Sequence, residues 1–272
     1  MKQNQIYLSM LLMTSLLTLT SCQDVVGTGG ELSEILMNKT LVIGTNAEYA
    51  PFEYLDGASQ TVVGFDMDVV GLLETHLENT YDVDINVVVK DMAFDGLIGS
   101  LQANQIDLIA AAFTKNAERA ESVLFSDIYY QAQTVVVMKS NQTKIIDYAS
   151  LGGLKLGAQL GTVQVDFALE ASGSAQNIKA LASLSTLLSD LEVGNLDAIL
   201  VEKPVAMNMV QKQSGLKYTE EIAFADDDGY AFATNHGKEA FIDEINTVIF
   251  KATENGSLAS MYVAALDASL GG

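Results

Sequence analysis

The sequence predicts an α/β fold with two lobes. In the first half, apolar runs typical of strands alternate with stretches that have helical periodicity, and the same alternation begins again after residues 135–137. A short strand and a helical stretch then follow near the carboxyl end. With 272 residues, of which 49% are hydrophobic, the chain is long enough for two lobes of ordinary size.

In the first half, strands are predicted at residues 41–45, 85–89 and 106–111. Two helical patterns separate these strands, one beginning at Gly64 and one centred near Leu97. The apolar positions that share a helical face are Phe65, Val69, Leu72 and Leu73 in the first pattern and Phe94, Leu97, Ile98 and Leu101 in the second. This order of elements indicates parallel βαβ units.

The second half repeats the arrangement. Its predicted strands are 135–137, 154–158 and 198–201, and its helices open at Gly161-Thr162 and cover 183–193. Residues 226–233 combine an acidic turn with a short strand, and a helical stretch covers 238–255. We therefore predict lobe 1 from residues 38–131 plus 225–272 and lobe 2 from residues 132–224. The chain would cross between them near 131–134 and 224–232.

The amino-terminal residues resemble an export signal. An apolar stretch at residues 6–20 follows Lys2, and it is shorter than the ~20 residues that a transmembrane helix needs. It ends in Leu19-Thr20-Ser21-Cys22, which resembles the lipobox of bacterial lipoproteins. We predict a signal peptide over 1–21, a lipidated Cys22 that anchors the protein to the outside of the cell membrane, and a tether over 22–37. An ordinary signal peptide with an incidental cysteine is the alternative.

Composition argues against several classes of function. There are 35 acidic and 14 basic residues, and the resulting charge of -21 repels nucleic acids. The single cysteine rules out an intramolecular disulfide, and His76 and His236 have no cysteine or carboxylate cluster beside them that would predict a metal site. No phosphate-binding glycine loop or GxSxG motif is present. We therefore expect a binding protein without catalytic residues, cofactor or metal.

Several motifs together resemble one family, and they cover about residues 40–265. They are IGTNAEYAPFEY at 43–54, VGFDMD at 63–68, FDGLI at 94–98, IDLI at 106–109, the spaced residues from Thr114 to Tyr130, LGT at 160–162, and DAI and PVA at 197–206. The chain is similar to family 3 extracellular solute-binding proteins, the polar amino acid receptors of ABC importers. The resemblance implies a type II periplasmic-binding-protein-like fold, in which each lobe is a sheet flanked by helices and the ligand lies in the cleft between them.

The resemblance also implies how the protein would act. A monomer would bind a free amino acid, close its lobes around it and deliver it to an ABC permease that is driven by a separate ATPase. Arg119 matches the family's carboxylate-binding arginine, and its planar fork suits a carboxylate better than lysine does. Thr114, Thr162 and Val163 would add backbone N–H groups, and Thr114 would also add its hydroxyl. Many members carry a second Ser or Thr where this chain has Val163.

The remaining contacts concern the ammonium and the side chain of the ligand. The carbonyl of Ala112 and the carboxylate of Glu202 would accept from the ammonium, and Glu202 stands where the family usually has Asp. Tyr49 and Phe94 match the aromatic pair that encloses the ligand's aliphatic part. Asn46 stands where many members carry an Asp that meets a polar or cationic side chain, so a preference for lysine, arginine or histidine over glutamine is not indicated.

Other interpretations stay open at the level of the sequence. Arg119 could be a solvated surface charge, Thr162 only a helix cap, and Glu202 half of a surface salt bridge with Lys203. The protein could be an enzyme that reuses the same cleft, such as a dehydratase with Glu202 as its general acid. It could also be a ligand-sensing or adhesive lipoprotein that has no importer.

Overall fold

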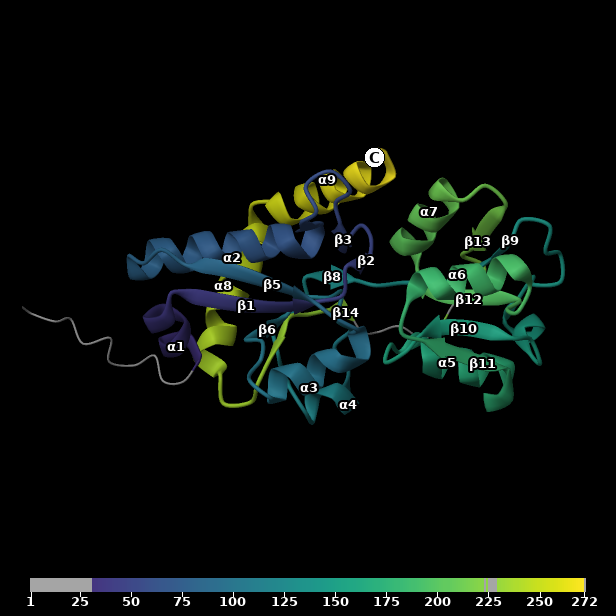
Figure 1. The fold of residues 1–272 in the computed structure, drawn as a ribbon, viewed down its shortest axis with the longest axis horizontal. Coiled ribbons are helices and arrows are strands. Elements are labelled where there is room, and N and C mark those ends of the chain that lie inside the picture. Colours follow the sequence, from purple (N-terminus) through teal and green to yellow (C-terminus); the bar gives the residue numbers. More distant parts are fainter. Residues whose placement is uncertain (1–30, 223, 225–228, 272) are drawn as a thin grey trace, which may run out of the picture.

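A computed structural model describes residues 31–222, 224 and 229–271. The predicted signal peptide, Cys22 and residues 22–30 of the predicted tether lie outside the described residues, as does the acidic turn at 226–228. Figure 1 shows two lobes side by side, each built around its own sheet. The fold is therefore α/β with two sheet-containing lobes, as the sequence predicts.

The first lobe has a five-stranded sheet of mixed direction. Its strand order is β5 (Asn86–Asp91), β1 (Thr40–Thr45), β6 (Leu108–Ile109), β15 (Ala233–Thr234) and β7 (Leu124–Phe125). β1 is parallel to β5 and β6, whereas β15 is antiparallel to its two neighbours. The helices of this lobe are α1 (Glu31–Asn38), α2 (Phe65–Tyr81), α3 (Leu97–Gln102), α4 (Ala117–Ala120), α8 (Glu239–Glu254) and α9 (Ser257–Gly271), and a 3₁₀ turn (Phe94–Gly96) precedes α3.

The second lobe repeats this plan. Its strand order is β11 (Ile178–Leu181), β10 (Leu156–Gln159), β12 (Ala198–Glu202), β9 (Thr134–Lys139) and β13 (Leu216–Thr219). β10 is parallel to β11 and β12, and β9 is antiparallel to β12 and β13. Its helices are α5 (Gln164–Ser172), α6 (Leu184–Val193) and α7 (Lys203–Lys212), with 3₁₀ turns at Tyr148–Leu151 and Ala175–Asn177.

The central strands of both sheets are buried on two faces, because their alternate side chains enter different clusters. In β12, Ile199 and Val201 pack on the side of α6 and α7, whereas Ala198 and Leu200 pack on the side of α5. This explains why the central strands read as continuous apolar runs in the sequence.

Two short sheets accompany the main ones. β8 (Tyr130–Gln131) pairs with β14 (Gly229–Tyr230) just before the chain enters the second lobe at β9. β2 (Glu48–Tyr49), β3 (Glu53–Leu55) and β4 (Val62–Val63) form the other small sheet, on the cleft side of the first lobe. The exact residues at which each lobe begins and ends remain predictions.

The structure differs from the sequence-based expectation at the amino-terminal end. Residues 31–37, expected to be the last part of the tether, belong to helix α1. Leu32 and Ile35 of this helix are buried in the core of the first lobe. Because these apolar side chains are three positions apart, they share one face of the helix and hold it against the lobe.

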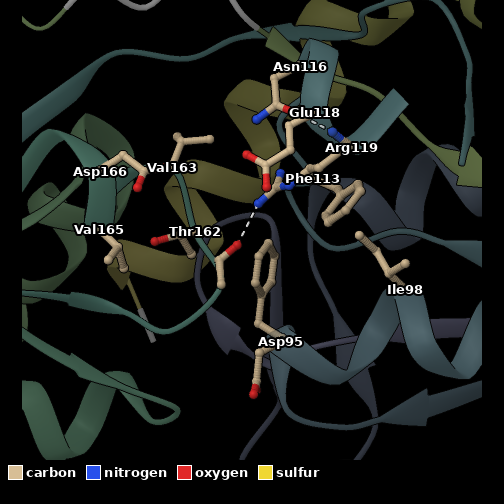
Figure 2. Close-up of a pocket in the computed structure, with 12 residues that line it drawn as sticks. Asp95, Ile98, Phe113, Asn116, Glu118, Arg119, Thr162, Val163, Val165 and Asp166 are labelled. Carbon is tan, nitrogen blue, oxygen red and sulfur yellow. Dashed lines mark hydrogen bonds between the residues drawn. The ribbon is translucent and has the colours of Figure 1, made fainter. Parts of the chain in front are cut away.

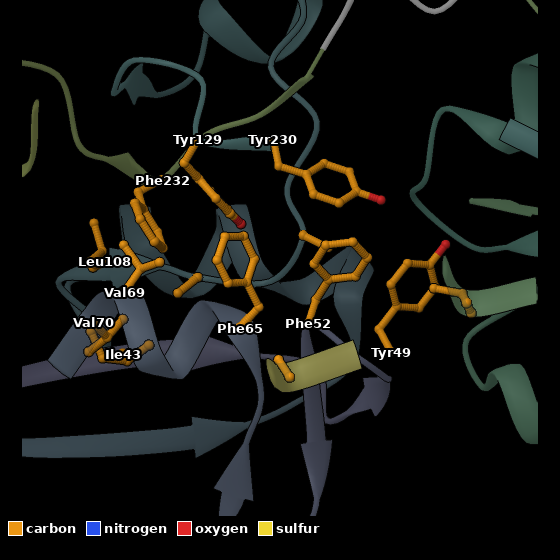
Figure 3. Packing of buried hydrophobic residues seen from close by; sticks show 14 of the residues in the cluster. Ile43, Tyr49, Phe52, Phe65, Val69, Val70, Leu108, Tyr129, Tyr230 and Phe232 are labelled. Carbon is orange, nitrogen blue, oxygen red and sulfur yellow. The ribbon is translucent and has the colours of Figure 1, made fainter. Parts of the chain in front are cut away.

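An aromatic cluster fills the first lobe on the side that faces the second lobe (Figure 3). Phe52 is fully buried, and its ring lies 5.0 Å from the rings of both Tyr130 and Tyr230, measured between centroids. Tyr49 and Tyr230 direct their hydroxyls away from this cluster and toward the second lobe. Phe52 therefore belongs to the core of the first lobe.

Gly64, which precedes α2, is a position where a side chain cannot be accommodated. Its φ is +127°, and a Cβ atom there would lie 2.4 Å from the carbonyl oxygen of Phe52. We expect Gly64→Ala to lower the free energy of unfolding by about 1–3 kcal/mol. Gly71→Ala, in the middle of the same helix, is the matched control because nothing lies within 4 Å of its added methyl group. Urea unfolding curves that show no loss for Gly64→Ala would contradict this expectation.

Candidate functional site

A small cavity lies between the lobes and collects most of the predicted site. It is lined by Tyr49, Phe94, Ala112 and Thr114 from the first lobe and by Gln159, Thr162, Gln164 and Glu202 from the second. Its volume is about 10 Å³, which is room for about one water molecule. An amino acid can therefore enter only if the lobes separate or side chains such as Tyr49 move.

Glu202 ends β12 and is 2% exposed. Its Oε1 accepts from Nε2 of Gln164 at 2.8 Å, and its Oε2 accepts from the hydroxyl of Tyr49 on the opposite lobe. Burial, and then the charge of Glu202, raise the pKa of Tyr49 well above its usual value, so this phenol stays protonated and able to donate. The surface salt bridge with Lys203 is not present, because Lys203 instead pairs with Glu220 at 2.7 Å.

Arg119 is the only arginine in the chain, and it is 8% exposed rather than solvated. Its Nη1 donates to the carbonyl of Thr114 at 2.7 Å. Its Nη2 donates to the carbonyl of Gly161 in the second lobe, also at 2.7 Å, and Figure 2 marks this bond with a dashed line. The guanidinium carbon lies 4.1 Å from the centroid of Phe113. Burial lowers the pKa of Arg119 to about 10, so the group remains charged at neutral pH.

Ala112 is held in a strained conformation at the base of the cavity. Its φ of 45° is in the left-handed region, which alanine rarely adopts. The backbone N–H of Ala112 donates to Oδ2 of Asp66 at 2.8 Å, and the hydroxyl of Tyr129 donates to the same oxygen at 2.8 Å. Burial raises the pKa of Asp66 to about 7. Asp66 thus fixes the turn that carries Ala112 into the site.

Thr162 and Val163 lie at the beginning of α5. The helix starts at Gln164 with Val163 as its N-cap residue, one position later than the cap that the sequence suggested. Thr162 does not cap the helix with its side chain, because its Oγ1 donates to the carbonyl of Gln159 at 2.7 Å. Both residues stay at a helix amino terminus that faces the cleft, where backbone N–H groups favour an anion.

Asn46 is buried next to the cavity and forms an interlobe amide pair. Its Oδ1 accepts from Nε2 of Gln159 at 2.8 Å, and its Nδ2 donates to the carbonyl of Met92 at 2.8 Å. Gln159 and Gln164 were not predicted from the sequence. Gln164 could have been found, because it follows Thr162-Val163 and so begins the helix that opens on the cleft.

A larger cavity of about 310 Å³ adjoins the first one, and Arg119 and Val163 are among the residues that line it (Figure 2). Phe94 and Thr162 line both cavities. The larger cavity also has three carboxylates, those of Asp95, Glu118 and Asp166, on its lining. The structure therefore brings all nine predicted ligand-binding residues to the interface between the lobes.

In residues 31–222, 224 and 229–271, no group of three or more His, Cys, Asp or Glu side chains is arranged to hold a metal ion. Within the same part of the chain, no helix is both long and apolar enough to cross a membrane.

Comparison with known proteins decides the family. Residues 41–266 match the model of the bacterial extracellular solute-binding proteins, family 3. The chain belongs to this family. This family member is therefore a solute-binding protein that acts outside the cytoplasm, and it is not an enzyme.

Relatives of this solute-binding protein agree in length and fold. The arginine-binding extracellular protein ArtP of Bacillus subtilis is 30% identical over 82% of this chain and 84% of that protein. The L-cystine-binding protein TcyJ of Escherichia coli is 27% identical over 85% of this chain and 84% of that protein. A Streptococcus pneumoniae substrate-binding protein, AbpA, solved with L-arginine, has a TM-score of 0.79 at 27% identity and covers 88% of this chain and 99% of its own.

Proposed function

We propose that this protein binds a free polar amino acid in the interlobe cleft and delivers it to an ABC importer. The observation that carries the proposal is the pair of opposite buried charges at one cleft, Arg119 from the first lobe and Glu202 from the second. A zwitterion presents both charges and needs a partner for each when it leaves water. Relatives described as arginine-, histidine- and cystine-binding proteins support this assignment.

Each end of the amino acid would meet residues of both lobes. The carboxylate would receive hydrogen bonds from Arg119, from Thr114 and from the backbone at Thr162 and Val163. The ammonium would donate to Glu202 and to the carbonyl of Ala112, in place of the Tyr49 hydroxyl that now lies on Glu202. Tyr49 and Phe94 would enclose the aliphatic part of the ligand.

The residues beside the small cavity favour a ligand side chain that forms hydrogen bonds. Asn46 and Gln159 form the amide pair there, and amides can both donate and accept. An ancestral arginine-binding protein solved with bound glutamine, 28% identical to this chain with a TM-score of 0.75, shows that a protein of this fold can accept an amide side chain. We propose a polar amino acid on these grounds.

Delivery would depend on lobe closure. The small cavity has room for about one water molecule, so the lobes would have to open to admit an amino acid and would then close around it. The closed form of a monomer would dock on the permease, and the ATPase of the importer would drive transport. Loss of uptake in cells that lack the chain would separate this role from that of a ligand-sensing lipoprotein.

We also propose that Cys22 carries lipid and anchors the protein to the outer side of the cell membrane. Cys22 lies outside the described residues, and the proposal is supported by the sequence Leu19-Thr20-Ser21-Cys22. Intact-mass analysis of protein extracted from membranes should show a chain that starts at Cys22 with more than one acyl chain, because one chain anchors only marginally. An unmodified thiol on a soluble protein would contradict this proposal.

Calorimetric titration with the twenty L-amino acids tests the binding function directly. At least one polar amino acid should bind with a dissociation constant well below 1 mM. If none of the twenty binds at about 1 mM, the proposed function is wrong.

A further inference from the structure

The side chain of Glu48 crosses from the first lobe to the second. Its Oε2 accepts from the backbone N–H of Leu184 at 2.8 Å, and more weakly from that of Ser185 at 3.4 Å. The hydroxyl of Ser183 lies 3.0 Å from Oε2 and 3.2 Å from Oε1 of the same carboxylate. All three donors belong to the amino terminus of α6, and Glu48 lies in β2 of the first lobe.

This carboxylate completes the cap of α6 from the opposite lobe. A helix amino terminus has N–H groups without partners inside the helix and carries the positive end of the helix dipole. Ser183 is the N-cap residue, but its own bond from the N–H of Thr186 is 3.4 Å long. Glu48 therefore provides the shorter hydrogen bond at this terminus and the negative charge that suits it.

Glu48 does not line the cavity in which the amino acid would lie. In β2, Tyr49 is buried and lines that cavity, whereas Glu48 is exposed, because successive side chains of a strand point to opposite faces. The interlobe contact of Glu48 is thus separate from the contacts that select the ligand. It breaks when the lobes move apart, and the N–H groups of α6 then turn to water.

We propose that Glu48 is an affinity-determining residue that holds the lobes closed without touching the amino acid. The inference rests on the proposed function, in which the closed form is the one that retains the ligand. A contact that exists only in the closed form multiplies the affinity for every ligand by the same factor, because it acts on the population of that form. This uniform factor distinguishes closure from recognition.

The test uses Glu48→Gln and Glu48→Ala in the mature protein, with Glu34→Gln as the matched control. Glu34 is an exposed glutamate of α1, so the control removes one negative charge away from the cleft. Affinities are measured for those of L-arginine, L-histidine, L-cystine and L-glutamine that the wild type binds. We expect Glu48→Gln to weaken each of them by the same factor of about three to ten, mainly through faster dissociation, and Glu48→Ala by more.

A second measurement reports closure without reference to ligand identity. Small-angle X-ray scattering should give Glu48→Ala a larger radius of gyration than the wild type, with the control unchanged. Unchanged affinities and an unchanged radius of gyration would overturn the inference, and so would losses that differ between ligands, because they would indicate contact with the ligand. If the wild type binds none of the four, the proposed function is in question, whereas the role of Glu48 is still decided by the scattering data.

Discussion

Replacing Arg119 with alanine is expected to weaken amino acid binding by about a hundredfold to a thousandfold, which corresponds to roughly 3–4 kcal/mol. The variant would leave the ligand carboxylate in a buried site without its cationic partner. Arg119→Lys keeps the charge but not the planar fork, so its loss should be smaller, about 1.5–3 kcal/mol. Calorimetric titration of both variants with the best-bound amino acid measures the two effects.

Two comparisons isolate the carboxylate contact from other effects of these changes. Lys251→Ala removes one positive charge from an exposed position on α8 and should leave affinity unchanged. Because Arg119 also bonds to Gly161 across the cleft, its loss could act through closure alone. An amide of the same amino acid, which lacks the carboxylate charge, separates these possibilities. If Arg119→Ala weakens the amide as much as the free acid, Arg119 is a closure residue and not the carboxylate partner.

The strands and helices with one dominant pattern were predictable from the sequence. β1 and β9 are buried strands with consecutive apolar residues, and α2 has apolar side chains at helical spacing. Helix α9 was missed because small and apolar residues occur all around it, so the hydrophobic pattern shows no helical period and marks no buried face. Helix α7 was missed although Pro204 stands in its first turn, which is a helix-start signal.

The site was predictable where its residues match the family motifs. Arg119 and Glu202 were assigned to the site through the family motifs, because by residue type alone each could also be a surface charge. Gln159 did not stand out, because neutral amides occur throughout the sequence and no spacing marks it, whereas Gln164 could have been found from its place at the start of α5. The contact of Glu48 with Leu184 joins residues 136 positions apart, so it depends on how the lobes meet and has no local pattern.

Glu202→Gln is the second change for which we expect a large effect. The substitution keeps the size of the side chain but removes the negative charge that would face the ligand ammonium. In a site of reduced dielectric this charge is worth more than it is in water, so affinity for the best-bound amino acid should fall by several-fold to about a hundredfold. The hydrogen bond from Gln164 can persist, because the new amide oxygen still accepts.

The same variant should have little effect on a ligand without an α-amine. We would titrate wild type and Glu202→Gln with the best-bound amino acid and with its deaminated and N-acetylated analogues. Glu220→Gln is the matched control, because Glu220 is an exposed glutamate of the same lobe that pairs with Lys203 outside the cavity. A loss confined to the amine-bearing ligand would identify Glu202 as the ammonium partner. Equal losses for all three ligands would instead mean that Glu202 serves the cleft through its bonds to Tyr49 and Gln164, and no loss for any of them would also show that it is not the ammonium partner.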